Sequence, residues 1–301
     1  MGRIRVRIRP ITSPSELVEV EELQRKVWGM DDVDVVPAHM MVAALMCGGL
    51  VLGAYDEEGR LVGFVFGITG LRGGRLVHHS HMAGVLPEAR YRGVGYQLKL
   101  AQREHVLRQG FELIEWTFDP LRAPNARLNL TKLGGVSATY LENLYGALRD
   151  ELDRGVPSDR LLVEWWLRSE RVLSKLEGRL RPPSLEELLE AGVALANDVE
   201  LVSVRGRVVE DVRRVRTDLD SPGVLVRIPA DDQLVRRASP EAYVRWRLAL
   251  RRALTSYLSR GYVAVELISE VVDGRRENYY LLVRASLEDV LREGESYFNL
   301  L

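Results

Sequence analysis

Residues 78–105 read HHSHMAGVLPEARYRGVGYQLKLAQREH, and this stretch decides the fold. A strand over residues 76–86 is followed by Pro87 and a short loop. The loop leads into an amphipathic helix over residues 92–109, which Gly110 ends. It does not match the dinucleotide fingerprint, because no third glycine follows at the required spacing, and it lacks the Gly-Lys-Ser or Gly-Lys-Thr of a P-loop.

The junction between this strand and helix has the chemistry of an anion cradle. Gly93 and Gly95 let the backbone come close to a ligand, because neither carries a Cβ. The first amides of a helix have no internal partner and lie at the positive end of the helix dipole. Arg90 and Arg92 add charge. The segment therefore predicts a site for a diphosphate.

The elements around this junction alternate between strands and helices up to about residue 170. We expect strands over 3–10, 50–55, 61–69, 76–86, 111–118, 136–145 and 161–167, and helices over 13–28, 38–46, 92–109 and 123–133. A charged helix over 169–179 precedes Arg181-Pro182-Pro183, the candidate linker.

The remaining residues predict a second α/β region. We expect a helix over 185–194, strands near 199–209 and 224–228, a long helix over 240–260, and a hairpin of 263–271 with 279–283. The predicted domains are therefore residues 1–170, a connection over 171–183, and a smaller α/β lobe over 184–301. The lobe should pack on the first domain and carry no second cofactor loop.

Composition excludes several classes of protein. The formal net charge of -1 argues against a general nucleic-acid binder, and the single cysteine, Cys47, excludes an intrachain disulfide and a thiolate metal cluster. The alternating start favours a strand over a secretion signal, and the longest apolar stretch, near residues 40–52, is too short to span a bilayer. We expect a cytoplasmic protein that binds neither nucleic acid nor membrane, has no metal site and could form a homodimer.

Almost all of the positive charge is arginine, because lysine occurs at only four positions: Lys26, Lys99, Lys132 and Lys175. With few Cys, Asn and Gln, this pattern favours a heat-adapted source. A GC-rich genome would give the same arginine bias, and hyperthermophiles enrich lysine and glutamate instead.

At the junction, Val85-Leu86-Pro87 followed by Arg90-x-x-Gly93-x-Gly95 resembles the GNAT superfamily of acyl-CoA N-acyltransferases. The preceding order of elements, the strand over 111–118 and the helix ending Lys132-Leu133-Gly134 are similar too. The resemblance covers residues 1 to about 170, and the whole chain resembles a two-lobed branch of predicted GNAT proteins. It implies a mixed, largely antiparallel, twisted sheet flanked by helices.

The resemblance also implies a co-substrate, acetyl-CoA or another acyl-CoA. The backbone amides of residues 90–96 would bind its diphosphate, and the strand edge at 83–85 would pair with the pantetheine arm. The thioester would lie where the strands over 76–85 and 111–118 splay apart. The residues implied in binding are Val85, Arg90, Tyr91, Arg92, Gly93, Val94, Gly95 and Tyr96, with Asn125 and Asn129 as further contacts.

Amine acylation needs a base, because only a neutral amine attacks the thioester. Strand alternation places His79 and His81 on one face and His78 on the other. In arylalkylamine N-acetyltransferases, a histidine pair at the same offsets from the motif forms the proton path, whereas other GNAT branches carry a glutamate at the earlier offset. We expect His81 to be the catalytic base, assisted by His79, unless both are merely hydrogen-bonded strand residues.

The second motif departs from the superfamily. Alignment on Lys132-Leu133-Gly134 puts Ala123 at the usual asparagine and Leu130 at the usual tyrosine that protonates the thiolate. Tyr140 and Tyr145 are possible replacement acids, although core positions suit buried tyrosines better. The thiolate can also leave unprotonated.

Three functions remain open. The leading one is transfer of an acetyl or larger acyl group from CoA to a primary amine of a small molecule, with an amino acid among the candidates. The others are acylation of a peptide or protein N-terminus, and a non-catalytic acyl-CoA sensor or scaffold. If the histidines are not the base, Asp119 or a strand-held water is the next candidate, although Asp119 more simply caps the following helix.

Overall fold

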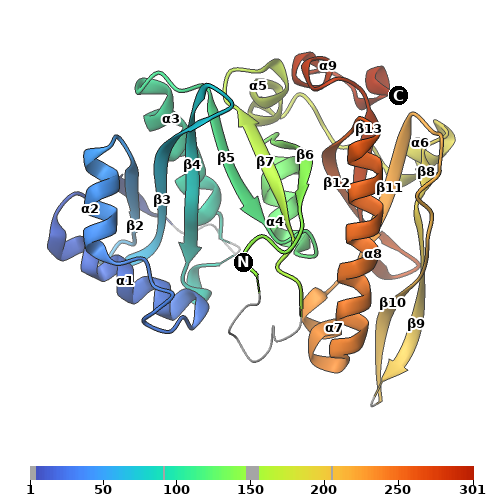
Figure 1. The fold of residues 1–301 in the computed structure, drawn as a ribbon, viewed down its shortest axis with the longest axis horizontal. Helices are drawn as coiled ribbons and strands as arrows, with labels where there is room; N and C mark the ends of the chain where they lie inside the picture. Colours follow the sequence, from blue (N-terminus) through green and yellow to red (C-terminus); the bar gives the residue numbers. More distant parts are fainter. Residues whose placement is uncertain (1–4, 91, 147–155, 205) are drawn as a thin grey trace. The chain divides into compact units, whose positions relative to one another are not determined.

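The computed structural model describes residues 5–90, 92–146, 156–204 and 206–301 (Figure 1). The chain divides into two compact units, residues 1–116 and 117–301. The division falls within strand β5, Leu113–Phe118, whose last two residues belong to the second unit. The two units are described separately below.

In the first unit, a five-stranded sheet carries helices on both faces. Its elements are β1 (Arg7–Pro10), α1 (Pro14–Trp28), α2 (Ala38–Met46), β2 (Leu50–Tyr55), β3 (Leu61–Arg72), β4 (Arg75–Val85), a 3-10 turn (Pro87–Ala89), α3 (Val94–Arg108) and β5. The strand order is β1-β2-β3-β4-β5. The pairs from β1 to β4 are antiparallel, and β4 pairs with β5 in parallel.

Strand alternation divides the apolar residues of this unit into two cores. Val51, Phe64 and Phe66 pack with residues of α1 and α2. Leu52 and Val65, which alternate with them, pack in a second cluster with residues of α3. The sheet is therefore buried on both faces, and α3 is anchored against it.

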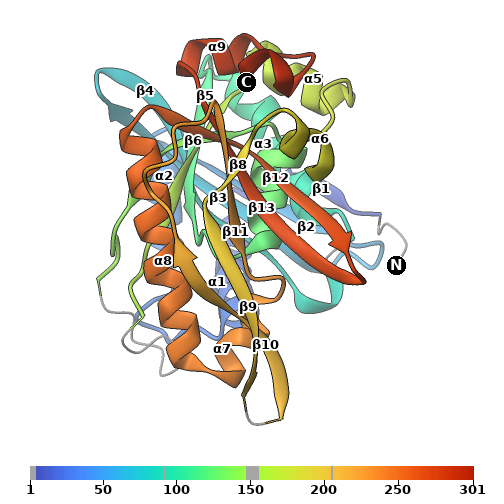
Figure 2. The ribbon, with the colours of Figure 1, turned by 90° about the vertical axis from the view of Figure 1, so that its right-hand side faces the viewer.

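The second unit has a six-stranded sheet and a separate hairpin. Its elements are α4 (Ala123–Ala126), η2 (Arg127–Lys132), β6 (Val136–Leu141), β7 (Arg160–Trp166), α5 (Glu170–Glu177), α6 (Leu185–Glu190), β8 (Ala194–Leu195), β9 (Asn197–Val204), β10 (Arg207–Val215), β11 (Gly223–Ile228), α7 (Asp232–Ala238), α8 (Pro240–Ser259), β12 (Tyr262–Val272), β13 (Arg275–Arg284), α9 (Leu287–Arg292) and η3 (Tyr297–Leu300). The strand order is β7-β6-β12-β13-β11-β8, and β9 pairs with β10. Figure 2 shows α8 and the β9–β10 hairpin of this unit from the side.

Most expected elements are present, and the second unit differs from the expectation in several places. The helix predicted over 123–133 begins as α4 and continues as the π-helix η2, where the amide of Leu133 donates to the carbonyl of Leu128. The strand region near 199–209 is the hairpin of β9 and β10. Helix α7 was not expected, and it begins after Asp231 because the side chain of Asp231 accepts from the amide of Leu234 and caps the helix.

The compact units differ from the domain boundary expected from sequence at residues 171–183. Strands β6 and β12 are paired, Ser137 with Ala264, although they lie on opposite sides of that linker. Strands β6 and β7 therefore belong to the same compact unit as the later strands. The linker at residues 181–183, and the domain boundary that it implies, stay predictions.

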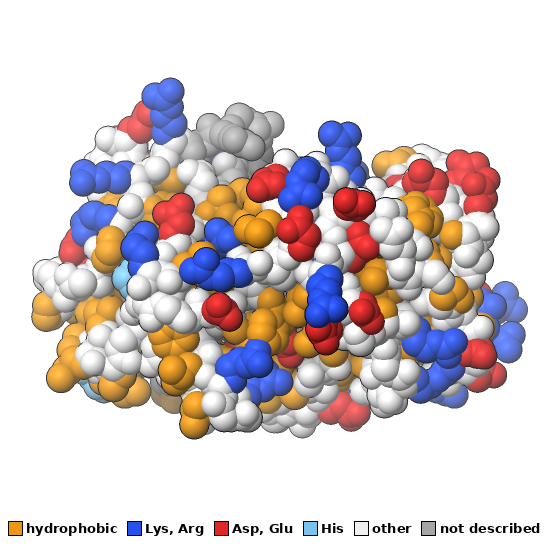
Figure 3. Space-filling model, turned by 90° about the horizontal axis from the view of Figure 1, so that it is seen from above, with side chains coloured by type: hydrophobic (Ala, Val, Ile, Leu, Met, Phe, Trp, Pro, Cys, Tyr) orange, Lys and Arg blue, Asp and Glu red, His pale blue; other side chains and the backbone are white. Residues whose placement is uncertain are grey.

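On the face in Figure 3, acidic, basic and hydrophobic side chains are interspersed. No helix within the described ranges is both long and apolar enough to cross a bilayer.

Candidate functional site

The strand β4 parts from β5 soon after they pair. Their register comprises His78 with Ile114 and His79 with Glu115, and no further pair occurs among the described residues. On its other edge, β4 remains paired with β3 as far as Val85, which is opposite Gly63. The edge of β4 beyond His79 that faces β5 therefore has backbone groups free of the β5 ladder.

The helix α3 begins close to the end of β4. Gly93 is the N-cap residue with a φ of 90°, a conformation that glycine adopts without strain, and no side chain caps the helix. The first amide to bond within the helix is that of Gln97, which donates to the carbonyl of Gly93 at 3.1 Å. The amides of Val94, Gly95 and Tyr96 precede it and have no acceptor in the helix. These three amides belong to the segment predicted to bind the diphosphate, and that binding stays a prediction.

Nothing in the packing of the fold requires a glycine at position 95. A Cβ built there would meet only the Cγ2 of Val85, at 3.9 Å, which is an ordinary contact. Glycine near a helix start is less stabilising than alanine by about 0.5–1 kcal/mol. The fold therefore has room for a Cβ at position 95, and the close approach of a ligand there stays a prediction.

The two arginines of the loop have different environments. The guanidinium of Arg90 donates to the carbonyls of Val85, at 3.1 Å, and Val27, at 2.8 Å, and so ties the loop to the end of α1. The Nε of Arg92 is buried without a hydrogen-bond partner in the structure. Arg90 therefore holds the loop in shape, and the contact of Arg92 with an anion stays a prediction. Tyr91 lies outside the described residues.

His79 and His81 lie side by side on one face of β4, as alternation predicts. Their ring centroids are 6.3 Å apart, and the ring of His81 stands edge-on to Phe66 at 5.8 Å. The Nδ1 of His79 is 3.8 Å from the Oε1 of Glu115, the residue opposite it on β5. The other oxygen of Glu115 accepts from Arg72 at 2.6 Å. This set is named the histidine face: His79, His81, Glu115 and Arg72.

Both histidines of this face favour the neutral form. Burial lowers the pKa of His79 below the usual 6.5, and the carboxylate of Glu115 partly offsets that decrease. Burial also lowers the pKa of His81, and the neighbouring His79 adds to the effect. A neutral imidazole at neutral pH can accept a proton, as a general base must.

The opposite face of β4 holds a buried polar network. His78 is fully buried, and its Nε2 lies 3.1 Å from the amide nitrogen of Gln102. The amine of Lys99 donates to Ser80 at 2.8 Å and to Gln102 at 3.1 Å. Gly67 makes room for the imidazole, because a Cβ there would lie 2.2 Å from the Nε2 of His78. This set, named the buried face, is closed by α3.

The residues expected from the second motif belong to the second unit. Asn125 is exposed, whereas Asn129 and Leu130 are buried. The hydroxyl of Tyr140 donates to Asp159 at 2.8 Å, and burial with that carboxylate nearby raises its pKa. Tyr140 is thus a poor acid for a departing thiolate. The role of the two asparagines stays a prediction.

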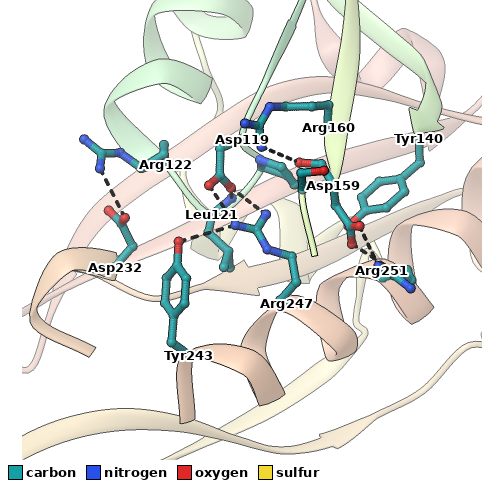
Figure 4. Close-up of polar contacts among 12 residues, drawn as sticks. Asp119, Leu121, Arg122, Tyr140, Asp159, Arg160, Asp232, Tyr243, Arg247 and Arg251 are labelled. Atoms are coloured by element: carbon teal, nitrogen blue, oxygen red, sulfur yellow. Dashed lines mark hydrogen bonds and ion pairs between the residues drawn. The ribbon is translucent and has the colours of Figure 1, made fainter. Parts of the chain in front are cut away.

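Asp119, the alternative base, is held in an ion pair (Figure 4). Both of its oxygens accept from the guanidinium of Arg247 at 2.7 Å, and one also accepts from the amide of Leu121 at 2.9 Å. Burial alone would raise its pKa, but Arg247 outweighs burial and holds the pKa below the usual 3.8. Such a carboxylate is a weak proton acceptor, and its bond to Leu121 is the capping role that the sequence favours.

Sequence reasoning missed Glu115 and Arg72. Glu115 is a lone acid in the apolar run Leu113–Phe118, and it is almost fully buried. A buried acid without a partner in its own strand is rare. That rarity is the signal that could have identified it, since β4 and β5 were already expected to be neighbours.

No protein-family model matches the sequence, and no curated protein sequence matches it. Among solved structures, the chain is similar to a candidate acetyltransferase from Salmonella typhimurium, solved with its cofactor acetyl-CoA, with 18% identity and a TM-score of 0.45 over 54% of this chain and 94% of that one. A candidate GNAT-family acetyltransferase from Desulfovibrio desulfuricans has 17% identity and a TM-score of 0.44, covering 54% and 99%. Arabidopsis thaliana NAA60, in complex with a bisubstrate analogue, has 17% identity and a TM-score of 0.43, covering 54% and 99%.

Proposed function

We propose that this protein is an acyl-CoA-dependent N-acyltransferase that moves an acetyl or larger acyl group to a primary amine of a small molecule. Its co-substrate is acetyl-CoA or another acyl-CoA. The observation that carries the proposal is the position of a glycine-opened helix N-terminus at the end of a strand that has parted from its parallel neighbour.

The cradle and the strand edge suit two different parts of acyl-CoA. The free amides of Val94, Gly95 and Tyr96, with the guanidinium of Arg92, provide donors and positive charge for the diphosphate. The edge of β4 beyond His79 offers backbone donors and acceptors to the amide groups of the pantetheine arm. Both contacts involve backbone groups, so the sequence around them need not be polar.

The histidine face supplies the proton acceptor. His81, neutral at pH 7, takes the proton of the attacking amine, and the amine nitrogen forms a bond to the thioester carbon. The bond between that carbon and sulfur then breaks, and CoA leaves as the thiolate. His79 assists His81, and Glu115, fixed by Arg72, stabilises the positive charge that reaches His79.

A thermal-shift titration tests the central part of the proposal. Acyl-CoA that binds only the native state should raise the melting temperature. Gly95→Val should abolish that shift with only a small change in the stability of the unliganded protein, because a Cβ at this position would meet only the Cγ2 of Val85, at 3.9 Å. If acyl-CoA gives no shift with the wild-type protein at saturation, the proposal is wrong.

Gly93→Val is the matched comparison. Its positive φ makes any side chain there strained, by about 1–2 kcal/mol, so this variant should lose stability as well as binding. Gly95 therefore separates loss of the ligand site from loss of the fold.

A thiol-release assay with acetyl-, succinyl- and longer acyl-CoA against a panel of amines tests the reaction. Release with small amines supports the proposed function, and release with peptides alone assigns the protein to N-terminal acylation. A thermal shift without release from any pair assigns it to an acyl-CoA sensor.

A further inference from the structure

The second unit contains a cavity of about 380 Å³ that the proposed reaction does not use. Its walls come from three segments: the π-helix η2, the chain from Pro182 into α6, and the later half of β12. All ten residues that line it lie between positions 127 and 270, so the cavity belongs to one compact unit. Small-molecule sites in proteins have volumes of about 300–1,000 Å³, and this cavity falls in that range.

Three charged side chains line the cavity, and they do not neutralise one another at close range. They are Arg127, Glu187 and Glu270, so the lining carries two negative charges and one positive charge. Arg127 forms no ion pair with any carboxylate in the described part of the chain. Arg127 and Glu187 are solvent-exposed, so a ligand can reach the cavity from solution.

Both carboxylates are oriented by backbone amides at the start of α6. One oxygen of Glu187 accepts from the amide of Ser184 at 2.7 Å and from its hydroxyl at 2.8 Å, which completes a capping box. These bonds hold the pKa of Glu187 below the usual 4.5, so it is ionised at neutral pH. One oxygen of Glu270 accepts from the amide of Leu185 at 2.9 Å. The second oxygen of each carboxylate has no hydrogen-bond partner among the residues described.

The remaining walls are largely apolar and are held in place. Leu267 and Ile268 are buried residues of β12, and the rings of Pro182 and Pro183 fix the φ angles of the segment that leads into α6. The hydroxyl of Thr131 donates to the carbonyl of Leu267 at 3.3 Å and so ties η2 to β12. The cavity therefore combines fixed charges with an apolar surface that suits an aliphatic chain.

We propose that this cavity is a binding site for a basic α-amino acid, and this proposal does not depend on the proposed function. The guanidinium of Arg127 binds the α-carboxylate of the ligand through two parallel hydrogen bonds. The unpartnered oxygens of Glu187 and Glu270 bind its two cationic groups, and its aliphatic chain lies on Leu267 and Ile268. A basic amino acid carries two positive charges and one negative charge, which complement the two carboxylates and one guanidinium of the lining.

Isothermal titration calorimetry of the full chain with L-arginine and L-lysine tests the site. Each amino acid has one analogue without the carboxylate, agmatine or cadaverine, and one without the side-chain charge, citrulline or norleucine. At least one of the two amino acids should bind the wild-type protein at least about tenfold more tightly than both of its own analogues, because each analogue lacks one charged hydrogen bond.

Three variants assign the contacts. Arg127→Gln should weaken binding of that amino acid at least about tenfold and leave binding of its decarboxylated analogue nearly unchanged, because the variant and the analogue remove the same interaction. Glu187→Gln and Glu270→Gln should each weaken binding of the amino acid by a similar factor. Glutamine at either position still accepts from the backbone amide, so α6 should stay capped and the melting temperature of the unliganded protein should change little.

Arg181→Gln and Glu186→Gln are the matched controls. Both positions are exposed and adjoin lining residues in the sequence, but neither lines the cavity. Both variants should bind the amino acid as the wild-type protein does. A loss of affinity as large in these controls would show a general effect of charge and overturn the site.

The remaining outcomes separate this site from the proposed reaction. No binding of either amino acid overturns the site, and so does an affinity that is equal for the amino acid and its decarboxylated analogue. Binding that Arg127→Gln leaves unchanged also overturns it, since the amino acid then binds elsewhere, for example as an acceptor. The titrations contain no acyl-CoA, so failure of the site leaves the proposed function standing, and a lack of thiol release leaves the site standing.

Discussion

Both faces of β4 carry histidine, but the histidines of the two faces lie in different environments. His78 on the buried face is fully inaccessible, contacts Gln102 and the ring of Phe111, and has its pKa lowered to about 3 by burial. His79 and His81 on the histidine face remain partly exposed, and His79 lies near a carboxylate. Three histidines within four residues therefore do not form one functional group.

This difference shows how a functional histidine can be told from a structural one. On the buried face, Gln102 contacts the Nε2 of His78 from within the fold, Gly67 leaves room for the ring, and the Nδ1 of His78 is buried without a hydrogen-bond partner. On the histidine face, Glu115 and Arg72 organise a ring that nothing closes over in the described part of the first unit. We propose that exposure together with a charged partner, rather than residue type, distinguishes the proton path of the proposed reaction.

The largest expected effect comes from removing the base. His81→Gln should lower turnover by about 10²-fold or more, the usual scale for loss of a general base. The defect should shrink at high pH, where the amine loses its proton unaided, and affinity for CoA should barely change. Steady-state kinetics from pH 6 to 10 measure both. Near-normal turnover of this variant at neutral pH would remove His81 from the mechanism.

His78→Gln is the control on the buried face, and its effect should be on stability. The imidazole fills a closed site and contacts Gln102, so its loss should destabilise the fold by about 1–2 kcal/mol and leave the pH dependence of turnover unchanged. The wild-type protein should also lose stability between pH 6.5 and about 3. In that range the unfolded chain protonates His78 and the folded chain does not.

Local sequence patterns predict much of the fold because they act over short distances. The alternation of β4, the capping Ser13 of α1 and the positive φ of Gly93 each depend on neighbouring residues. The π-helix of η2 and the hairpin of β9 and β10 were harder to predict. The first changes the bonding within a continuous helical pattern, and the second depends on a turn inside a run of strand residues.

The candidate site is only partly visible in the sequence for a related reason. The cradle and the histidines lie within one continuous stretch, so their spacing is readable. Glu115 and Lys99 have partners that are distant in the chain, Arg72 for Glu115 and Ser80 for Lys99. The sequence also cannot show that the guanidinium of Arg90 donates its hydrogen bonds to the carbonyls of Val85 and Val27.

A smaller effect is expected from the residue that orients His79. Glu115→Gln removes a carboxylate that raises the pKa of His79, so that pKa should fall further below 6.5. Turnover should drop about tenfold, because the positive charge that reaches His79 is less stabilised. NMR titration of the imidazole and the acid limb of the pH–rate profile measure the two changes. Arg72→Gln, which leaves the carboxylate in place, should have a weaker effect on both.

The smallest effect is expected from Lys99→Met at high pH, and its growth on acidification tests the buried face. Burial places the pKa of Lys99 well below 10.5. The amine lies 3.6 Å from the ring centroid of Trp116, and this weak cation–π contact does not reverse the effect of burial. Below pH 10.5 the unfolded chain therefore binds a proton on Lys99 that the folded chain does not, and the wild-type protein loses stability as the pH falls. Methionine has no such proton and a similar shape, but it loses the hydrogen bonds to Ser80 and Gln102, so the variant should be less stable by about 1 kcal/mol at pH 10.5. Toward neutral pH the variant should become progressively the more stable one. Chemical denaturation of both proteins at several pH values measures the difference, and a difference that stays constant with pH would show that Lys99 is charged in the folded state.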